Sequence, residues 1–261
     1  MQANAILTTE DLNMRFGGLL AVSDFSAAIP QGSITGLIGP NGAGKTTCFN
    51  MITGFYRPTT GRVVFNGHDI TGLPPHKVCR AGIARTFQNI RLFGNETVLE
   101  NVMIGRHLRQ KTSWLSALVF TPAYRREDKA IRNRSLELLD AVGLADVAGE
   151  KAASLPYGAQ RRLEIARALA TEPGFLLLDE PAAGMNPQES EELMEFVRRI
   201  REAFDLTILL IEHDMKVVMG ICEHIWVLDY GVTIASGPPA AIRSDPKVIM
   251  AYLGEEDDSD A

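Results

Sequence analysis

The sequence is poor in cysteine and contains no long hydrophobic run. Among its 261 residues there are three cysteines, Cys48, Cys79 and Cys222, and they lie far apart. Such a small, odd set predicts neither a disulfide framework nor a zinc ribbon, and it favours a reducing compartment. No apolar stretch approaches the roughly 18 residues that a membrane-spanning helix requires. Acids precede the first base, Arg15, so we expect no secretory signal and attribute any membrane association to a partner.

An excess of charge of one sign is also missing from most of the chain. The formal net charge is −6, but five acids gather at the C-terminal end: Glu255, Glu256, Asp257, Asp258 and Asp260. The remainder is nearly neutral, so we expect no nucleic-acid partner. We interpret the terminal acids as solvated surface charge.

What is present is a globular composition, with 46% hydrophobic and 22% charged residues, sufficient for one domain or two closely packed lobes. Continuous apolar runs at 33–38, 175–178 and 206–211 are typical of parallel strands that are covered on both faces. Between them lie amphipathic segments, one of which starts with the helix-initiating sequence Asn186-Pro187-Gln188-Glu189. This alternation predicts an α/β core.

Two regions differ from that core. Segments 7–16, 21–29 and 61–69 have the pattern of short strands, with Asn66-Gly67 as a turn, and predict an antiparallel sheet. The middle of the chain, about 89–153, is mainly helical, because Ile131, Leu138 and Val142 recur on one face of a charged segment. We see no internal repeat.

The strongest motif is a glycine-rich segment directly after the first apolar run. It matches G-x-x-x-x-G-K-[ST] at every fixed position, and it reads Gly39-Pro40-Asn41-Gly42-Ala43-Gly44-Lys45-Thr46. Glycines let backbone amides approach phosphate oxygens, and the start of the following helix favours negative charge. Lys45 is placed to reach the β- and γ-phosphates, and Thr46 to bind Mg²⁺. The motif predicts a nucleoside-triphosphate site.

Two carboxylates follow the second apolar run and complete this site. Asp179 suits the Mg²⁺ shell, directly or through water. Glu180 is placed to polarise the attacking water. A strand that ends in Asp-Glu is by itself more often a cap or surface charge. In a chain that also has a complete phosphate loop, the same ending instead indicates carboxylates of the nucleotide site.

Four further motifs decide between the families that use such a loop. They are Thr86-Phe87-Gln88, Leu155-Pro156-Tyr157-Gly158-Ala159, Ala183-Gly184-Met185-Asn186 and Ile211-Glu212-His213-Asp214. In this order they resemble the ATP-binding cassette of ABC transporters across essentially the whole chain. A GTPase is excluded, because the guanine-reading sequence N-K-x-D does not occur.

The resemblance implies a RecA-like P-loop core with a mostly parallel sheet, an N-terminal antiparallel β subdomain and an inserted helical subdomain. We expect the first part of the ATP-binding core at 1–88, the helical subdomain at 89–153 and the second part of the core at 154–236. A C-terminal helical extension with the acidic tail would occupy 237–261.

The resemblance also assigns roles to residues of the site. Glu180 would be the general base, His213 the γ-phosphate sensor and Lys45 part of the electrostatic cradle. Phe16 would stack on adenine, although an aromatic at a strand end is often a core residue. The expected nucleotide contacts are Phe16, Gly39, Pro40, Asn41, Gly42, Ala43, Gly44, Lys45, Thr46, Thr47, Tyr157 and Gly158, and the expected Mg²⁺ contacts are Thr46, Gln88 and Asp179.

On this resemblance, Leu155–Ala159 is the signature segment, which commonly reads Leu-Ser-Gly-Gly-Gln in the family. This chain departs from that sequence. Pro156 replaces the serine that would donate to the γ-phosphate bound by a second cassette. Pro156 has neither a hydroxyl group nor an N–H. The amides of Tyr157, Gly158 and Ala159 remain at a helix N-terminus. Either these backbone donors suffice, or the composite site that uses this signature hydrolyses ATP slowly.

Among transport cassettes, the chain most resembles the LivG-type ATPases of branched-chain (hydrophobic) amino-acid importers. The stretches that carry this resemblance are Ala84–Phe93, Arg161–Leu169, Ile242–Gly254 and the insertion at Trp114–Arg125. Such an importer implies a second cassette, either a different chain or a homodimer in isolation. It also implies two transmembrane permease subunits, a periplasmic amino-acid-binding protein, and a peripheral location on the cytoplasmic face of the inner membrane.

A permease subunit would contact the surface formed by Leu92, Phe93, Val98 and Leu99, unless these apolar residues belong to the core. Other cargo remains possible on sequence alone, since lipopolysaccharide-export and urea-import cassettes are similar. A non-transport ABC ATPase of DNA repair or translation is a further alternative. Its usual long coiled-coil arm or second cassette is missing from this sequence. Pro156 alone would support a switch that binds ATP without hydrolysing it.

Overall fold

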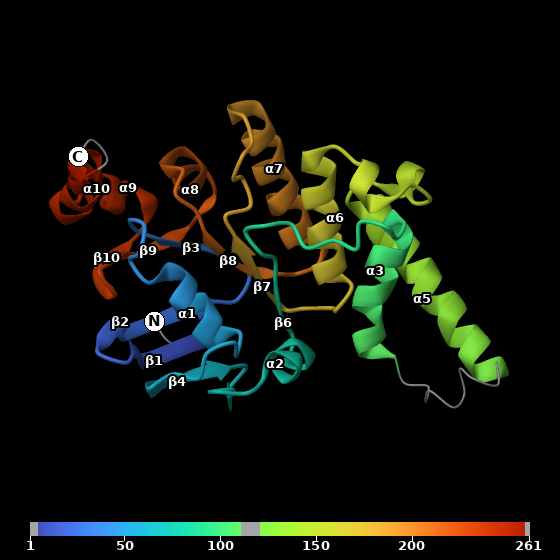
Figure 1. Cartoon of the computed structure of the whole chain (residues 1–261), viewed down its shortest axis with the longest axis horizontal. Helices are drawn as coiled ribbons and strands as arrows, with labels where there is room; N and C mark the ends of the chain where they lie inside the picture. Colours follow the sequence, from blue (N-terminus) through green and yellow to red (C-terminus); the bar gives the residue numbers. More distant parts are fainter. Residues whose placement is uncertain (1–4, 111–120, 259–261) are drawn as a thin grey trace. The chain divides into compact units, whose positions relative to one another are not determined.

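The computed structural model describes residues 5–110 and 121–258. Most of the insertion predicted at Trp114–Arg125 falls on 111–120 and therefore lies outside the described residues. The chain forms two compact units (Figure 1). A core unit comprises Met1–Arg85 and Gly174–Ala261, and a helical unit comprises Thr86–Pro173.

The core unit contains a six-stranded sheet with the order β10-β9-β3-β8-β7-β6. Its strands are β3 (Ile34–Ile38), β6 (Ile83–Arg85), β7 (Phe175–Asp179), β8 (Thr207–Ile211), β9 (His224–Asp229) and β10 (Val232–Gly237). All neighbours pair in parallel except β9 and β10, which are antiparallel. The register aligns Leu37 with Ile211, and Ile211 with Asp179, so β3, β8 and β7 end at the same level.

Helices cover both faces of this sheet. Helix α1 (Lys45–Ile52) lies on one face, and α7 (Pro187–Ala203) and α8 (Met215–Ile221) lie on the other (Figure 1). Every residue of β3, β7 and β8 is buried as a result. The continuous apolar runs therefore predicted these strands correctly, because neither face of a covered strand needs polar residues.

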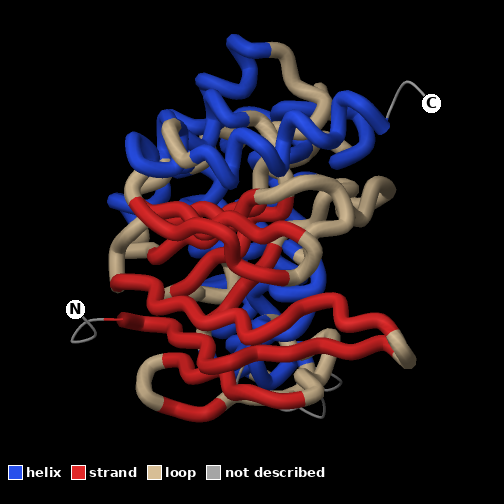
Figure 2. The backbone as a smooth tube through the Cα atoms, turned by 90° about the vertical axis from the view of Figure 1, so that its left-hand side faces the viewer, coloured by secondary structure: helices blue, strands red, loops and turns tan. Residues whose placement is uncertain are grey.

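A second, antiparallel sheet has the order β2-β1-β4-β5 (Figure 2). Its strands are β1 (Ala5–Phe16), β2 (Leu19–Pro30), β4 (Thr60–Phe65) and β5 (His68–Asp69). Asn66 and Gly67 form the turn between β4 and β5, and both have positive φ angles. The predicted α/β core with an N-terminal antiparallel sheet is confirmed.

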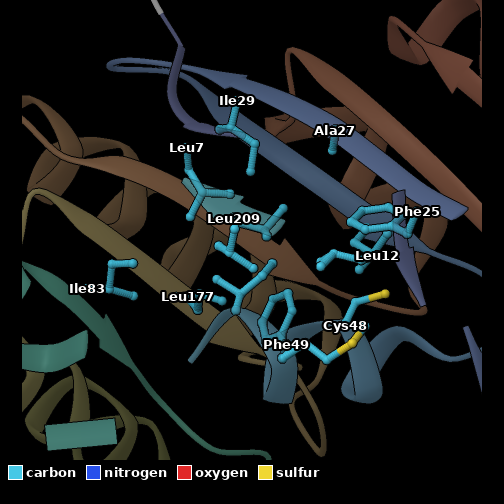
Figure 3. Packing of buried hydrophobic residues seen from close by; sticks show 14 of the residues in the cluster. Leu7, Leu12, Phe25, Ala27, Ile29, Cys48, Phe49, Ile83, Leu177 and Leu209 are labelled. Atoms are coloured by element: carbon cyan, nitrogen blue, oxygen red, sulfur yellow. The ribbon is translucent and has the colours of Figure 1, made fainter. Parts of the chain in front are cut away.

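The main hydrophobic cluster joins the two sheets through α1 (Figure 3). Leu12 and Phe25 come from the antiparallel sheet, Leu177 and Leu209 from the parallel sheet, and Phe49 from α1. All five side chains are buried. Helix α1 is therefore held on both sides, and this fixes the segment that precedes it.

The start of α7 has the predicted capping chemistry. The Asn186 side chain accepts the Glu189 N–H at 3.0 Å, and the Glu189 carboxylate accepts the Asn186 N–H at 2.9 Å. Pro187 occupies the first turn of the helix. This reciprocal pair satisfies two helix N–H groups that would otherwise have no partner.

The helical unit contains α3 (Val98–Arg106), α5 (Pro122–Ala141) and α6 (Tyr157–Leu169). Ile131 and Leu138 are buried on α5, followed by buried Val142. Helix α6 clusters with this unit because it packs on α3 and α5. The compact unit thus extends to Pro173, whereas the sequence places the boundary at 153.

The remaining elements are short or terminal. They are α2 (Pro75–Ala81), α9 (Pro239–Arg243), α10 (Pro246–Asp258) and the 3₁₀ turns His107–Arg109, Ala145–Val147 and Ala152–Ser154. Among the helices of residues 5–110 and 121–258, none combines the length and hydrophobicity needed to cross a membrane.

Candidate functional site

Three of the predicted motifs follow neighbouring strands of the parallel sheet. The glycine-rich segment 39–44 follows β3, Glu180 follows β7, and Glu212 and His213 follow β8. Strand β8 lies between β3 and β7. Because parallel strands share their carboxyl edge, the three motifs meet at one edge of the core unit, where α/β folds bind ligands.

The geometry of the glycine-rich loop requires glycine. Gly39, Gly42 and Gly44 have φ angles of 148°, 77° and 101°. A Cβ atom at Gly39 would overlap the carbonyl group of Leu228, and one at Gly44 would lie 2.7 Å from the carbonyl oxygen of Ala21. Side chains are excluded there, so the loop presents main-chain atoms at the N-terminus of α1, which is the arrangement that binds phosphate.

Lys45 lies inside this loop. Its side chain is buried, and Nζ donates to the carbonyl oxygens of Gly39 at 2.6 Å and Pro40 at 2.7 Å. The ammonium group is thus held at the centre of the loop. Anionic phosphate oxygens are stronger acceptors than neutral carbonyl oxygens, so the residues present fit a polyphosphate ligand.

The other predicted loop residues differ in exposure. Asn41 and Thr46 are exposed, Thr47 is half-buried, and Pro40 and Ala43 are buried. The exposed Thr46 hydroxyl is a hard oxygen donor of the kind that Mg²⁺ prefers, and so is the carboxylate of Asp179. Within the described residues, no three His, Cys, Asp or Glu side chains form a metal cluster. One carboxylate and one hydroxyl are the donors expected when substrate phosphates complete the shell.

Asp179 forms a buried ion pair that sequence reasoning missed. Its Oδ2 lies 2.6 Å from the guanidinium of Arg85, and each side chain is 7% exposed. The same guanidinium donates to Oδ1 of Asn50, on α1, at 2.6 Å. Arg85 therefore ties the acidic strand β7 to the helix of the phosphate loop. In the sequence it belongs to the stretch Ala84–Phe93, and nothing in that stretch links it to Asp179.

Glu180 and His213 approach each other beyond the ends of β7 and β8. Oε2 of Glu180 lies 3.7 Å from Nδ1 of His213, and their side chains are 19% and 61% exposed. Glu180 has a φ of 45°, and its N–H donates to the carbonyl oxygen of Ile211 at 2.9 Å. A left-handed glutamate costs on the order of 1 kcal/mol, so the surrounding strands hold the carboxylate in place.

Glu212 lies in the motif that carries His213, but the sequence assigned it no role of its own. It is 1% exposed, and Oε1 accepts the Ala182 N–H at 2.8 Å. Its Oε2 accepts the His213 N–H at 3.2 Å. Burial is the largest cause of a raised pKa for Glu212, and the negative charge of Glu180 raises that pKa further. Glu212 thus connects the segment after Glu180 to the backbone of His213.

Phe16 lies at the end of β1 and is 42% exposed, so it is not a core residue. Its ring makes an edge-on contact with Tyr56, with ring centroids 5.3 Å apart. An exposed, supported aromatic ring is suited to stack on a base. The sequence identified Phe16, whereas Tyr56 was not selected because nothing in the pattern links residues so far apart.

The remaining predicted contacts belong to the helical unit. Tyr157 and Gly158 are the first residues of α6, and Pro156 is the N-cap without a side-chain hydrogen bond. Tyr157 is exposed and Gly158 is half-buried. The first amides of a helix lack intrahelical partners and attract anions. Gln88 is exposed on a segment without helix or strand.

The predicted apolar contact surface of the helical unit needs a correction. Val98 is fully buried and Leu99 is 6% exposed, because the start of α3 packs into the unit. These two residues are core. Phe93 is 49% exposed, and the guanidinium of Arg167 lies 5.5 Å from its ring centroid. Leu92 is half-buried, so the available surface centres on Phe93.

Replacing Arg85 by Met should lower the free energy of unfolding by about 3 kcal/mol, because Asp179 would stay buried without the guanidinium. Urea denaturation of the purified chain measures this change. Arg62 and Glu10 form an exposed pair at 3.0 Å and provide the control. Arg62→Met should cost less than about 1 kcal/mol. Equal losses would show that the buried pair does not anchor this edge.

Replacing Glu212 by Gln should reduce the pH dependence of stability. Because the folded state raises the pKa of Glu212, the folded chain binds this proton more tightly than the unfolded chain does. The free energy of unfolding therefore falls as pH rises from the ordinary glutamate pKa through the raised one. Gln does not titrate and keeps an oxygen for the Ala182 N–H.

Urea denaturation from about pH 5 to about pH 8 tests this sign. The stability of Glu212→Gln relative to the wild type should increase with pH. The exposed substitution Glu195→Gln reports the effect of removing a surface carboxylate. A constant difference between Glu212→Gln and the wild type would contradict the prediction.

Comparison with known proteins agrees with this geometry. The family model described as "ABC transporter" matches residues 22–183. A second model, described as "Branched-chain amino acid ATP-binding cassette transporter", matches residues 232–258. The first match contains the glycine-rich loop and the two carboxylates Asp179 and Glu180 at the end of β7, and the second contains β10 and the C-terminal helices.

Individual relatives match along nearly the whole chain. The high-affinity branched-chain amino acid transport ATP-binding protein LivG of Salmonella typhimurium is 49% identical, and BraF of Pseudomonas aeruginosa is 48% identical; each match covers 96% of this chain and 98% of the relative. A crystal structure of an ABC-transporter ATP-binding cassette in its ADP conformation superposes with a TM-score of 0.84 at 35% identity. It covers 96% of this chain and 99% of that one. The chain therefore belongs to the ATP-binding cassette proteins of the ABC transporter family.

Proposed function

We propose that this chain is the Mg²⁺-dependent ATP-hydrolysing subunit of an importer for branched-chain or other hydrophobic amino acids. The chemistry rests on one observation: the loop that holds Lys45, the carboxylate of Glu180 and the imidazole of His213 share one edge of the parallel sheet. The cargo rests on the relatives at 48% and 49% identity and on the C-terminal match at 232–258.

In the proposed site, the amides of the loop and Lys45 bind the phosphates of ATP. Thr46 and Asp179 would hold Mg²⁺, and the family resemblance assigns Gln88 as a further contact of the ion. When bound, the ion neutralises charge on the β- and γ-phosphates. Glu180 accepts a proton from the attacking water, and His213 donates a hydrogen bond to the γ-phosphate. Each such contact stabilises charge that develops during phosphoryl transfer.

A second cassette completes each site in this proposal. The amides of Tyr157 and Gly158, at the N-terminus of α6, would face the nucleotide held by the partner cassette. The second cassette is a different chain in the importer, or a second copy in isolation. Two permease subunits, with a periplasmic binding protein beyond them, would place the chain peripherally on the cytoplasmic face of the inner membrane.

Replacing Glu180 by Gln should preserve ATP binding and lower hydrolysis by a factor of at least about 10² to 10³. Gln keeps the size and polarity of the side chain but cannot take up the proton. Isothermal titration with Mg-ATP measures binding, and phosphate release measures turnover. The exposed substitution Glu191→Gln, on α7, serves as the control. Unchanged hydrolysis in Glu180→Gln would show that another group is the base.

The cargo is tested in proteoliposomes that contain the chain, two permease subunits, the second cassette and the binding protein. Leucine, isoleucine and valine should stimulate ATP hydrolysis and enter the vesicles, whereas urea should do neither. Stimulation by urea alone would overturn the amino-acid assignment and leave the ATPase assignment intact.

The same preparation tests the surface around Phe93. Phe93→Asp should impair assembly with the permease subunits and leave ATP binding by the isolated chain unchanged. Met250, on α10, is 73% exposed, and Met250→Asp supplies the control for an added surface charge. Normal assembly of Phe93→Asp would show that the permease contacts another surface.

A further inference from the structure

Within the helical unit, a buried ion pair on α6 holds the segment that carries Gln88. Arg161 is 0% exposed and Glu164 is 2% exposed, and they lie one helical turn apart with 2.8 Å between Nη1 and Oε2. Neither residue belongs to the phosphate-contacting motifs. Both residues nevertheless form hydrogen bonds with the backbone next to Gln88, while Nε of Arg161 is buried without a hydrogen-bond partner among the described residues.

The contacts of the pair are directed at main-chain groups. Arg161 donates to the carbonyl oxygens of Phe87 at 2.8 Å and Gln88 at 2.9 Å. Oε1 of Glu164 accepts the N–H groups of Phe87 at 3.4 Å and Arg91 at 3.3 Å. The pair therefore forms hydrogen bonds with four backbone groups of a segment that belongs to no helix or strand.

This pattern distinguishes the pair from ordinary core packing. Buried ion pairs are seldom more stabilising than apolar residues of the same volume, because both charges lose their hydration. Apolar side chains cannot, however, form hydrogen bonds with the N–H and carbonyl groups of a segment that belongs to no helix or strand. The forked guanidinium and the carboxylate perform that task, and they fix the path of the backbone at Gln88.

The same guanidinium reaches the start of α6. Nη2 of Arg161 lies 3.3 Å from the hydroxyl oxygen of Tyr157, the first residue of the helix. Arg161 is thus in contact with both the Gln88 segment and the signature segment. These are the two parts of the helical unit to which the proposed function assigns roles at the nucleotide site, Gln88 toward Mg²⁺ and the signature segment toward ATP.

We infer that Arg161 and Glu164 are positioning residues that lock the Gln88 segment to the signature helix, so that the two nucleotide-contacting parts of the helical unit move as one body. The inference rests on the proposed function for the roles of Gln88 and the signature. The lock itself consists only of contacts within the helical unit.

The first test needs no nucleotide. Arg161→Lys keeps the positive charge but loses the fork, and Glu164→Gln keeps the volume but loses the negative charge. In both variants, hydrogen–deuterium exchange should become at least about tenfold faster at the amides of Phe87 and Arg91, which lose their acceptor or its support. Arg134→Lys is the matched control, because Arg134 and Glu137 form an exposed pair with the same spacing on α5.

The second test measures ATP hydrolysis in a double-mutant cycle with Gln88→Ala. Arg161→Lys should lower kcat on the order of 10- to 100-fold with little change in KM, because Gln88 is misplaced. In the Gln88→Ala background, the same substitution should have almost no further effect, since the two residues act through one contact. A purely structural role would lower kcat by the same factor in both backgrounds.

The outcomes separate this inference from the proposed function. The inference would be overturned if hydrogen–deuterium exchange at Phe87 and Arg91 were unchanged in both Arg161→Lys and Glu164→Gln, with both variants folded. It would also be overturned if Arg161→Lys lowered kcat by the same factor with and without Gln88→Ala. It would also fail if Gln88→Ala hydrolysed ATP like the wild type. If Lys45→Ala hydrolysed ATP at the wild-type rate, the proposed function would be overturned. The exchange experiment would still decide whether Arg161 and Glu164 hold the Gln88 segment on α6.

Discussion

The parallel register of β3, β8 and β7 is the constraint on which the rest of the core unit depends. It brings the phosphate loop, the His213 segment and the Asp179–Glu180 segment to one edge. Helix α1 then packs between the two sheets and fixes the loop from behind. The groups that directly follow these three strands are thereby placed by strand pairing that is fully buried.

Buried charge is the second principle of the structure. Arg85 connects β7 to α1. Glu212 connects the segment after Glu180 to the backbone of His213. Arg161 and Glu164 connect α6 to the Gln88 segment within the helical unit. Arg85 bonds to side chains, whereas Glu212, Arg161 and Glu164 form hydrogen bonds with backbone groups that lie outside helices and strands. Such contacts cost desolvation energy, and in return they define one conformation where loops would otherwise have several.

Local motifs allowed much of this to be predicted from sequence. The phosphate loop, the cap at Asn186 and the covered strands are all encoded in short stretches, and the structure contains them. The contacts of Arg85 with Asp179 and of Glu212 with Ala182 could not be found in that way, because these partners lie far along the chain. Val98 and Leu99 could not be assigned from sequence for a similar reason: an apolar residue after an irregular segment is equally compatible with a surface and with a core, and the structure places both in the core. The extent of the helical unit was also hidden, since the packing of α6 on α3 leaves no local signal.

The left-handed backbone at Glu180 has a consequence for anyone who wishes to redesign this chain. The main chain has a φ of 45° at Glu180, directly after β7, and this conformation sets the direction of the Cα–Cβ bond that carries the carboxylate. A β-branched replacement would strain the turn, and glycine would relax it while removing the acid. Transplanting the acid to a neighbouring position would aim it elsewhere. Relocating this carboxylate would therefore require a new path for the polypeptide, and not merely a different side chain.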